Sequence, residues 1–550
     1  MGDEDLIRGD LEWGTIPGLA RAAAATHGDR EAIVDPSEGA TADGSRRMSW
    51  NELVAEAEST ARALLAAGLQ MGDRVAIWAP NIWEWPVTLL GLQMAGGVLV
   101  PLNTRYKGLE AAQILNRSRA KYLFTVEGFL GNDYVSMLEG IDLPHLERTF
   151  LLRGAPPAGS LAEPCASLLA EDDPARRDEL GADLEARLTA LGPDDLSDLL
   201  FTSGTTGAPK GVMCTHGQTL RAFSDWASIV GLRSDDRYLV INPFFHAFGY
   251  KAGIVAALAK GSTMVLQAVF DVPTAMATIE AERISMIPGP PTLYQTILNH
   301  SDFDAGRLAS LRLAVTGAAV VPVELIRQMR EVLGFETVLT AYGLTECCGV
   351  VSISRADDDA ETIATYSGRA IPGVEVAVLD PDGAEVPRGE SGEVCVRGYN
   401  VMKGYFEAPE QTAETIDGDG WLHTGDVGVM DPRGYVRITD RLKDMFIVGG
   451  FNAYPAEIEA LLCNHPDVAQ AGVVGVPDER MGEVCFAFVV PTNGTTPDPA
   501  AIAAWARESM ANFKAPRRIE VVDALPLNAS GKVLRFELRD RAIEIVGSAS

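Results

Sequence analysis

Short apolar runs alternate with longer mixed segments over the first 370 residues of the chain. The runs at residues 74–79, 97–102, 121–126, 262–267, 284–289 and 311–317 are rich in Val, Ile and Leu. Strands that are apolar on both faces and separated by helices are typical of parallel sheets covered by helices. The pattern therefore predicts an α/β fold. Residues 154–196 are rich in Ala, Pro, Asp and Glu and predict a surface excursion with little β structure.

The hydrophobic pattern changes after about residue 370. Strand-like segments at residues 373–380, 392–398 and 434–440 are separated by PDG, RGE and PRG turns, which indicates an antiparallel sheet. The remaining residues are enough for a small α+β domain, with helices predicted at 455–464 and 499–510 and strands at 469–477 and 483–490. We therefore predict a large domain at residues 1–440 and a small one at residues 441–550.

The most apolar stretch, residues 87–102, is interrupted by Gln93 and a glycine pair and is shorter than the roughly 18 residues of a membrane span. It predicts a buried helix followed by a core strand, not an integral membrane segment. The N-terminus is acidic and no apolar segment follows it, so no secretory signal is predicted and a cytoplasmic location is expected.

Composition narrows the choice of partners. The formal net charge of −30 disfavours nucleic acid, and any polyphosphate would need a local cationic site. The seven cysteines are odd in number, and no CxxC pair or Cys/His cluster has metal spacing, so reduced thiols are expected. Cys347 and Cys348 are interpreted as a buried thiol pair.

Residues 202–211 read TSGTTGAPKG. Glycines let backbone N–H groups approach an anion, the hydroxyls donate hydrogen bonds, and Lys210 supplies a cation. The segment therefore predicts a phosphate-binding loop, against the alternative of a flexible Gly/Ser/Thr loop. It lacks the Gly-Lys-Ser/Thr sequence of a Walker loop, which disfavours a conventional P-loop NTPase.

This segment resembles the signature loop of the adenylate-forming superfamily, which includes acyl- and aryl-CoA synthetases, firefly luciferase and peptide-synthetase adenylation domains. Further motifs of that superfamily follow in the expected order, so the resemblance covers nearly the whole chain; they lie at residues 244–250, 316–319, 341–346, 423–426, 440–455 and 528–535. The resemblance implies stacked, mostly parallel sheets with a small β-barrel-like part, and a small mobile C-terminal domain. It also implies that ATP and a carboxylic acid form an acyl-adenylate, with Mg²⁺, and that coenzyme A then takes the acyl group.

The resemblance assigns a role to each position of the nucleotide site. Glu346, beside Thr345, would bind Mg²⁺, because a carboxylate facing a triphosphate needs a bridging hard cation; the alternative is a solvated glutamate at the start of a helix. Asp426 would accept hydrogen bonds from both ribose hydroxyls, assisted by Arg441. The other ATP- or AMP-binding positions are Thr202, Ser203, Gly204, Thr205, Thr206, Gly207 and Lys210 around the phosphates, and Gly317, Ala318, Ala319, Tyr342 and Gly343 around adenine.

Three further roles fall in the C-terminal part. Lys532 would stabilise the negative charge that gathers when the acid attacks the α-phosphate; without the resemblance it would read as a surface lysine. Lys443 would be the hinge between two catalytic conformations, against the alternative of a charged turn. Gly449 and Gly450 would line the coenzyme A tunnel. The resemblance also suggests a lysine acetyltransferase and deacylase acting on Lys532, and it allows a homodimer.

The acid is the least determined feature. His246 would orient the substrate carboxylate, although a packed structural histidine is the alternative. The expected acyl pocket mixes apolar and polar positions, which suits a bulky acid carrying carbonyls; it draws on Phe248, Tyr250, Ala252, Pro290, Pro291, Thr292, Ala318 and Leu344. No aspartate stands close after Phe244 and Phe245. Adenylation domains for α-amino acids generally have one at this position, where it pairs with the ammonium group of the substrate, so the resemblance disfavours amino acids as substrates. The motifs around these positions resemble actinobacterial ligases that activate the bicyclic propanoate left by steroid-ring breakdown.

Several alternatives stay open. A medium- or long-chain fatty acid-CoA ligase would share the same motifs. Fatty-acyl-AMP ligases, which do not transfer the acyl group to CoA, usually carry an insertion after the large domain that restrains the hinge. No insertion stands between Gly398 and Lys443, so this alternative is disfavoured. A luciferase-like oxygenase has no supporting signal. A non-catalytic homologue is disfavoured because the expected catalytic set is retained: Lys210, Glu346, Asp426, Arg441 and Lys532.

Overall fold

The computed structural model describes residues 8–36, 45–202, 209–317, 321–441, 444–448, 451–478, 481–492, 494–510, 512–527 and 533–547. Within these ranges the strands form two large sheets in the N-terminal part, an antiparallel sheet that follows them, and a further sheet near the C-terminus. The fold is a mixed α/β fold, which confirms the predicted fold class.

The largest sheet is parallel in its centre and antiparallel at both edges. Its parallel strands include the runs predicted at 262–267, 284–289 and 311–317. From edge to edge it contains β17 (Arg369–Ala370), β16 (Ser352–Ile353), β15 (Thr337–Tyr342), β14 (Leu313–Gly317), β13 (Met286–Pro288), β11 (Arg237–Val240), β12 (Thr263–Leu266), β1 (Glu31–Asp35) and β2 (Arg46–Ser49).

The second sheet is parallel except where β9 meets β10 and where β6 pairs with β5. It contains the other three predicted runs. Its order is β10 (Lys210–Thr215), β9 (Leu196–Thr202), β4 (Val98–Pro101), β3 (Arg74–Trp78), β5 (Ala120–Phe129), β7 (Arg148–Arg153) and β8 (Ala162–Pro164), with β6 (Asn132–Asp133) beside β5.

Helices cover these two sheets. One large apolar core lies between the sheets and takes in residues of α2, α3, α4, α9 and α11, while a second core on the other face of the largest sheet takes in α12, α13 and α14. Every residue of α4 is buried, and β4 follows it, as predicted for residues 87–102. The helices up to residue 331 are α1 (Gly9–Glu12), α2 (Ile16–His27), α3 (Trp50–Ala66), α4 (Glu84–Met94), α5 (Gly108–Ser118), α6 (Tyr134–Met137), α7 (Cys165–Leu169), α8 (Arg177–Ala190), α9 (His216–Ile229), α10 (Ala247–Gly249), α11 (Ala256–Lys260), α12 (Val272–Glu282), α13 (Pro291–Leu298) and α14 (Val323–Glu331).

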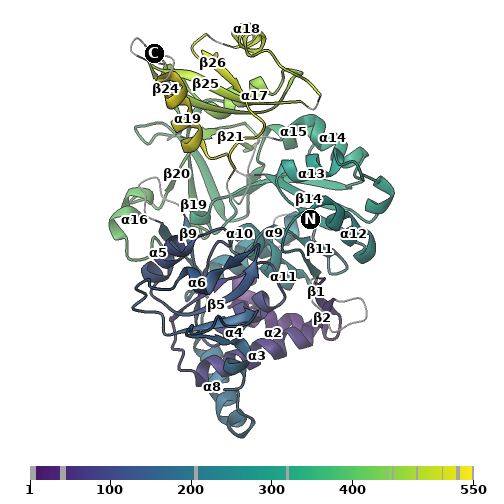
Figure 1. Ribbon diagram of the computed structural model, residues 1–550, viewed down its shortest axis with the longest axis vertical. Helices are drawn as coiled ribbons and strands as arrows, with labels where there is room; N and C mark the ends of the chain where they lie inside the picture. The colour runs from purple at the N-terminus through teal and green to yellow at the C-terminus, as the bar shows by residue number, and fades with distance from the viewer. Residues whose placement is uncertain are drawn as a thin grey trace.

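Residues 154–196 form the predicted excursion. Before β9 begins at Leu196, their only strand among the described residues is the short β8, and most side chains of α8 are exposed. In Figure 1, α8 projects from the lower end of the molecule, away from the C-terminal strands.

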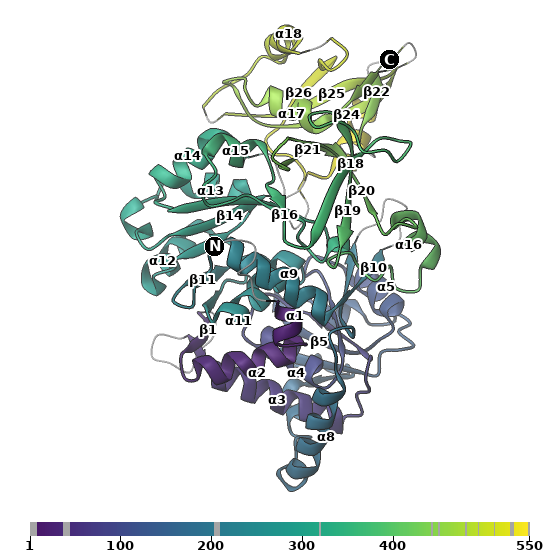
Figure 2. The ribbon, with the colours of Figure 1, turned by 180° about the vertical axis from the view of Figure 1, so that it is seen from behind.

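The antiparallel sheet consists of β18 (Val374–Leu379), β19 (Ser391–Gly398), β20 (Leu422–Met430) and β21 (Val436–Arg441), and it contains the segments predicted at 373–380, 392–398 and 434–440. Figures 1 and 2 both show it between the two large sheets and the C-terminal strands. One helix of this region, α16 (Pro409–Thr415), packs against β20, whereas α15 (Ala360–Thr365) packs against α14 and β15 of the largest sheet.

The C-terminal sheet contains β23 (Phe451–Ala453), β22 (Phe446–Val448), β25 (Gly482–Pro491), β24 (Val468–Asp478) and β26 (Arg518–Val521), packed with α17 (Pro455–Leu462), α18 (Pro499–Ser509) and α19 (Arg535–Gly547). The two helices and two strands predicted there are confirmed. The division at residue 440 into domains stays a prediction. Among the described residues, no helix is both long enough and apolar enough to cross a membrane.

His216, the first residue of α9, gives the fold a dependence on pH. It is fully buried, and its Nδ1 accepts a hydrogen bond of 3.3 Å from the backbone N–H of Ile16. Burial opposes the charged form and lowers the pKa of His216 to about 4. The unfolded chain therefore binds a proton below about pH 6.5 that the folded chain excludes.

Acidification from pH 7.5 to pH 4.5 is thus expected to destabilise the protein through His216, by roughly 2.5 kcal/mol at pH 4.5. The sign follows because stability rises with pH wherever the unfolded state holds more protons. Thermal unfolding of the wild type and of His216→Asn across this range measures the effect. The variant keeps an acceptor for Ile16, so its melting temperature should fall less on acidification. Parallel curves for the two proteins would contradict the assignment.

Candidate active site

The ends of the predicted phosphate loop are held side by side. Thr202 ends β9 and Lys210 begins β10, and the two residues are directly paired across the antiparallel strands. The ammonium of Lys210 lies over the ring of Tyr405, with Nζ 4.8 Å from the ring centroid. The hairpin therefore fixes the entry and exit of the loop, whose inner residues lie outside the described ranges.

Glu346 lies beside this hairpin. It belongs to a single helical turn, Thr345–Cys347, that follows β15. Its Oε1 accepts a hydrogen bond of 3.0 Å from the hydroxyl of Tyr405 and one of 3.4 Å from Oγ1 of Thr202. The structure thus brings together three predicted positions, Thr202, Lys210 and Glu346, which are far apart in the sequence.

Tyr405 is a site residue that sequence reasoning missed. Its hydroxyl donates to Glu346, its ring faces Lys210, and its backbone bridges to Val212 of β10. Burial, followed by the negative charge of Glu346, raises the pKa of Tyr405, so the phenol keeps its proton and can donate. In the sequence, Tyr405 is a tyrosine that follows a glycine in residues 402–406, between two recognised motifs. Such a dipeptide indicates no particular chemistry by itself.

Tyr342 and Asp426 join the largest sheet to the antiparallel sheet. The hydroxyl of Tyr342, at the end of β15, donates a hydrogen bond of 2.5 Å to Oδ2 of Asp426 in β20. Asp426 is buried, its backbone N–H donates to Oγ1 of Thr424, and its Cα partner across β20 and β21 is Arg441. The predicted adenine and ribose positions therefore adjoin each other.

Two glycines of this region pack closely against neighbouring backbone. Gly317 ends β14 at φ +159°, and a Cβ there would lie 2.7 Å from the carbonyl oxygen of Ala341. A Cβ on Gly343 would lie 2.2 Å from the carbonyl oxygen of Gly349. Backbone cannot move aside as a flexible side chain can, so both positions need glycine.

A buried ion pair links residue 198 of β9 to the substrate segment, residues 246–255. Nζ of Lys251 is 3.1 Å from Oδ1 of Asp198 and 3.3 Å from Sγ of Cys348, and the side chains of the lysine and the aspartate are 1% and 0% exposed. Burial opposes the charged form of Lys251, but the charge of Asp198, together with two thiols, raises its pKa. Cys347 and Cys348 are both buried, as predicted for the thiol pair. Lys251 thus connects β9 to the segment that carries Glu346.

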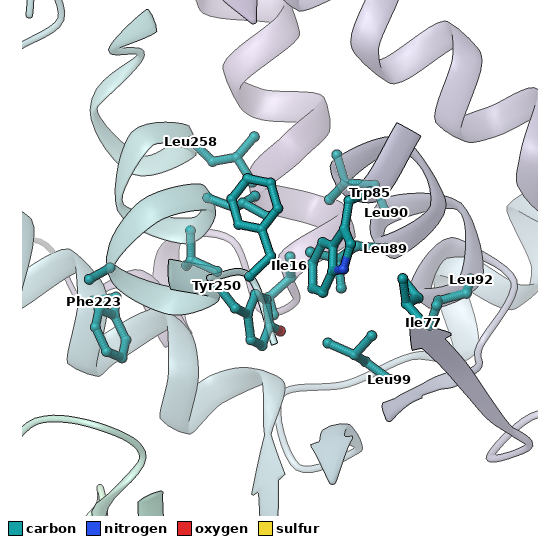
Figure 3. Close-up of a cluster of buried hydrophobic side chains, with 14 of the residues drawn as sticks. Ile16, Ile77, Trp85, Leu89, Leu90, Leu92, Leu99, Phe223, Tyr250 and Leu258 are labelled. Carbon is teal, nitrogen blue, oxygen red and sulfur yellow. The ribbon is translucent and has the colours of Figure 1, made fainter. Parts of the chain in front are cut away.

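The substrate segment, residues 246–255, is locally unusual. His246 is exposed and caps α10 by accepting the N–H of Phe248 at Nδ1, 3.2 Å away. Residues Tyr250–Val255 form a π-helical turn, a feature frequent at functional sites. Tyr250 and Ala252 are fully buried; the Tyr250 hydroxyl accepts from Gln93, and Figure 3 shows Tyr250 among core side chains that include Trp85 and Leu99.

Among the other predicted pocket positions, Phe248, Pro290, Thr292 and Leu344 are partly exposed and Pro291 is buried. The acyl-pocket role of all these residues stays a prediction. The remaining predicted positions lie outside the described residues: Ser203, Gly204, Thr205, Thr206, Gly207, Ala318, Ala319, Lys443, Gly449, Gly450 and Lys532, as does the side chain of Arg441.

Replacing Tyr405 with phenylalanine is expected to lower kcat/KM roughly 10-fold and, if Glu346 has its predicted role as a Mg²⁺ ligand, to raise the Mg²⁺ concentration needed for half-maximal rate. A hydrogen bond to a charged group contributes about 1.5–3 kcal/mol, and the phenylalanine ring still faces Lys210. Initial rates over a Mg²⁺ series measure both effects. Tyr435→Phe is the matched control, because its hydroxyl donates to Asp358 away from this site. Equal changes in the two variants would contradict a positioning role for Tyr405.

Comparison with known proteins identifies the class of enzyme. The model of the AMP-binding enzyme family matches residues 20–406, and the model of its C-terminal domain matches residues 457–532. The chain belongs to the AMP-binding enzyme family. It is an AMP-forming acyl-CoA ligase, which uses ATP and coenzyme A to activate a carboxylic acid.

Individual relatives extend over almost the whole chain. A ligase from Rhodococcus jostii, named for the coenzyme A ester of a 7a-methyl-1,5-dioxo-octahydro-1H-inden-4-yl propanoate, is 48% identical over 96% of this chain and 98% of its own length. The ligase of the same name from Mycobacterium tuberculosis is also 48% identical, over 90% and 94%.

Solved structures agree with this fold. The anthranilate CoA ligase AuaEII in complex with anthranoyl-AMP has a TM-score of 0.83 at 27% identity, with 100% of both chains covered. ATP-bound MatB from Rhodopseudomonas palustris has a TM-score of 0.78 at 29% identity, covering 96% of this chain and 99% of that one.

Proposed function

We propose that this ligase activates a bulky bicyclic propanoate that carries ring carbonyls. The observation that carries the proposal is the 48% identity, over nearly full length, to two ligases named for such an acid. A relative named feruloyl-CoA synthase is 38% identical, and one named medium-chain acyl-CoA ligase is 32% identical. The identity therefore falls as the named acid becomes planar or linear.

We infer the following chemistry from the arrangement of the chain's residues. A carboxylate oxygen of the acid attacks the α-phosphorus of ATP, the bond to the β-phosphate oxygen breaks, and diphosphate leaves. Lys210 and Thr202 hold the phosphates, and Asp426 holds the ribose. Lys532 offsets the charge gathering at the α-phosphate. The thiol of coenzyme A then attacks the acyl carbonyl, and AMP leaves.

A magnesium ion fits beside Glu346. The carboxylate stands at the start of the phosphate loop with the hydroxyls of Thr202 and Tyr405 next to it, and hard cations prefer such oxygen donors. When bound, the ion would neutralise phosphate charge. Tyr405 holds the carboxylate in place, and Lys210 approaches the same phosphates from the other strand.

The division of labour between the two ends of the chain is part of the proposal. Residues 1–440 would bind the acid and ATP, and residues 441–550 would rotate about Lys443 to bring first Lys532 and then Gly449 and Gly450 to the site. His246 and the predicted pocket residues would orient the acid. We also propose a cytoplasmic enzyme, in keeping with its free thiols, that works as a homodimer and is silenced by acetylation of Lys532.

Parallel measurement of diphosphate release and coenzyme A consumption tests the proposed acid. The panel contains the bicyclic propanoate, ferulate, anthranilate and a medium-chain fatty acid. We expect the bicyclic acid to have the highest kcat/KM, by about 10-fold or more, with the two products formed in equal amounts. A higher kcat/KM for the fatty acid would replace the bicyclic acid with that alternative. Diphosphate release without coenzyme A consumption would contradict the second half-reaction.

A further inference from the structure

Three side chains with different donor atoms meet on the antiparallel sheet. Glu393 and Cys395 lie two residues apart on β19, so they share a face, and His423 of β20 is the direct cross-strand partner of Cys395. A ligand atom of each residue lies within 4.8 Å of those of the other two. Sγ of Cys395 is 3.5 Å, and Oε2 of Glu393 is 2.8 Å, from Nδ1 of His423.

This set of donors suits zinc. Zn²⁺ binds thiolate, imidazole and carboxylate ligands at about 2.0–2.3 Å in tetrahedral geometry, which places neighbouring donor atoms about 3.3–3.8 Å apart. The separation between Cys395 and His423 already falls in that range. The separation between His423 and Glu393 is that of a hydrogen bond and would need to widen by about 0.5 Å, a small rotation of the glutamate side chain.

Further contacts hold the donors in orientation. Oδ2 of Asp417 is 3.6 Å from Nε2 of His423, on the side of the ring away from Cys395, and the N–H of Gly425 donates to Oε1 of Glu393 over 3.0 Å. A carboxylate at the second nitrogen of a histidine and a donor at the second oxygen of a carboxylate are the supports that zinc ligands have in proteins. The histidine side chain is 34% exposed, so an ion can reach it from solvent.

We propose that Glu393, Cys395 and His423 bind one Zn²⁺ ion, with water as the fourth ligand. Binding replaces the hydrogen bond between His423 and Glu393: Nδ1 of neutral His423 becomes the ligand atom, its ring proton resides on Nε2 beside Asp417, and the proton of the Cys395 thiol is released to solvent. The bound ion would link β19 to His423 of β20. Because Asp426 lies three residues further along β20, the ion would stabilise the strand that carries the proposed ribose ligand. It is separate from the magnesium site at Glu346 and does not depend on which acid the enzyme activates.

Cobalt titration of the full-length protein, stripped beforehand with a chelator, tests the site. We expect one Co²⁺ per chain, a thiolate-to-cobalt charge-transfer band in the near ultraviolet, and loss of the band when Zn²⁺ is added. Cys395→Ser should abolish the band. Asp417→Asn, which removes only the support of His423, should lower the zinc affinity about 10- to 100-fold.

Cys463→Ser is the matched control, because it removes an exposed thiol that lies outside the proposed site. Its band should be unchanged. Thermal unfolding without metal checks that each variant is folded, and His423→Gln replaces Cys395→Ser if the latter is not. A band that survives loss of Cys395 or His423, a band lost in Cys463→Ser, or no stoichiometric binding would each overturn the proposal.

Discussion

Alanine at position 532 is expected to abolish adenylation while sparing thioester formation from acyl-adenylate supplied to the enzyme. Lys532 lies outside the described residues, so the expectation rests on its motif, Ser530-Gly531-Lys532, and on the charge that gathers at the α-phosphate. Removing one preorganised group that stabilises such charge lowers the rate about 100- to 1000-fold. Diphosphate release measures the first half-reaction, and consumption of coenzyme A from synthetic acyl-adenylate measures the second.

Lys514→Ala is the matched control for this experiment, because it removes a lysine from the same C-terminal region. It should leave both half-reactions near the wild-type rate. If Lys532→Ala slowed both half-reactions to the same extent, the lysine would act through structure or through both steps, and the assignment to adenylation would fail.

Replacing Lys251 with methionine is expected to destabilise the protein by about 3–5 kcal/mol. The substitution leaves the carboxylate of Asp198, which is 0% exposed, without its cationic partner 3.1 Å away. An uncompensated charge in the interior is among the most costly single changes, and the loss here falls between β9 and the segment carrying Glu346. Urea or thermal unfolding followed by circular dichroism measures it.

The double variant Asp198→Asn/Lys251→Met separates charge from packing. With both charges removed, most of the lost stability should return, because the desolvation cost disappears with the charges. Arg327→Met is the surface control, since its partner Glu361 is largely exposed, and it should change stability by about 1 kcal/mol or less. A double variant as unstable as Lys251→Met would show that packing of the lysine stem, not charge, explains the effect.

Much of the framework could be predicted from the sequence because strand residues carry their own signal. Residues 75–79 and 97–102 are apolar throughout, and they lie in the neighbouring parallel strands β3 and β4. β26 and β22 were not predicted. They are short strands completed by pairing with β25, and hydrogen bonds between backbones leave little trace in a few side chains.

The site divides in the same way. Residues within one motif, such as Thr202 and Lys210, could be proposed together because the loop itself has a recognisable chemistry, and their role at the phosphates stays a prediction. The role of Tyr405 could not be predicted, because it depends on Glu346, which comes from a distant segment of the chain and whose Oε1 lies 3.0 Å from the Tyr405 hydroxyl. The pairing of Cys395 with His423 was missed for the same reason: 28 residues separate them in the chain, and only the register of two strands brings them together.

The position of β1 has a consequence for how the chain folds as it is synthesised. Ile33 pairs with Met264, about 230 residues downstream, and β1 is buried over most of its length. At ~5–20 residues per second, the ribosome needs roughly 10–50 s to supply that partner. Throughout this interval the apolar strand β1 lacks β12 and has β2 as its one native strand partner among the described residues. The segment made first must therefore complete its sheet late, and chaperones that cover such strands should matter for the yield of this enzyme.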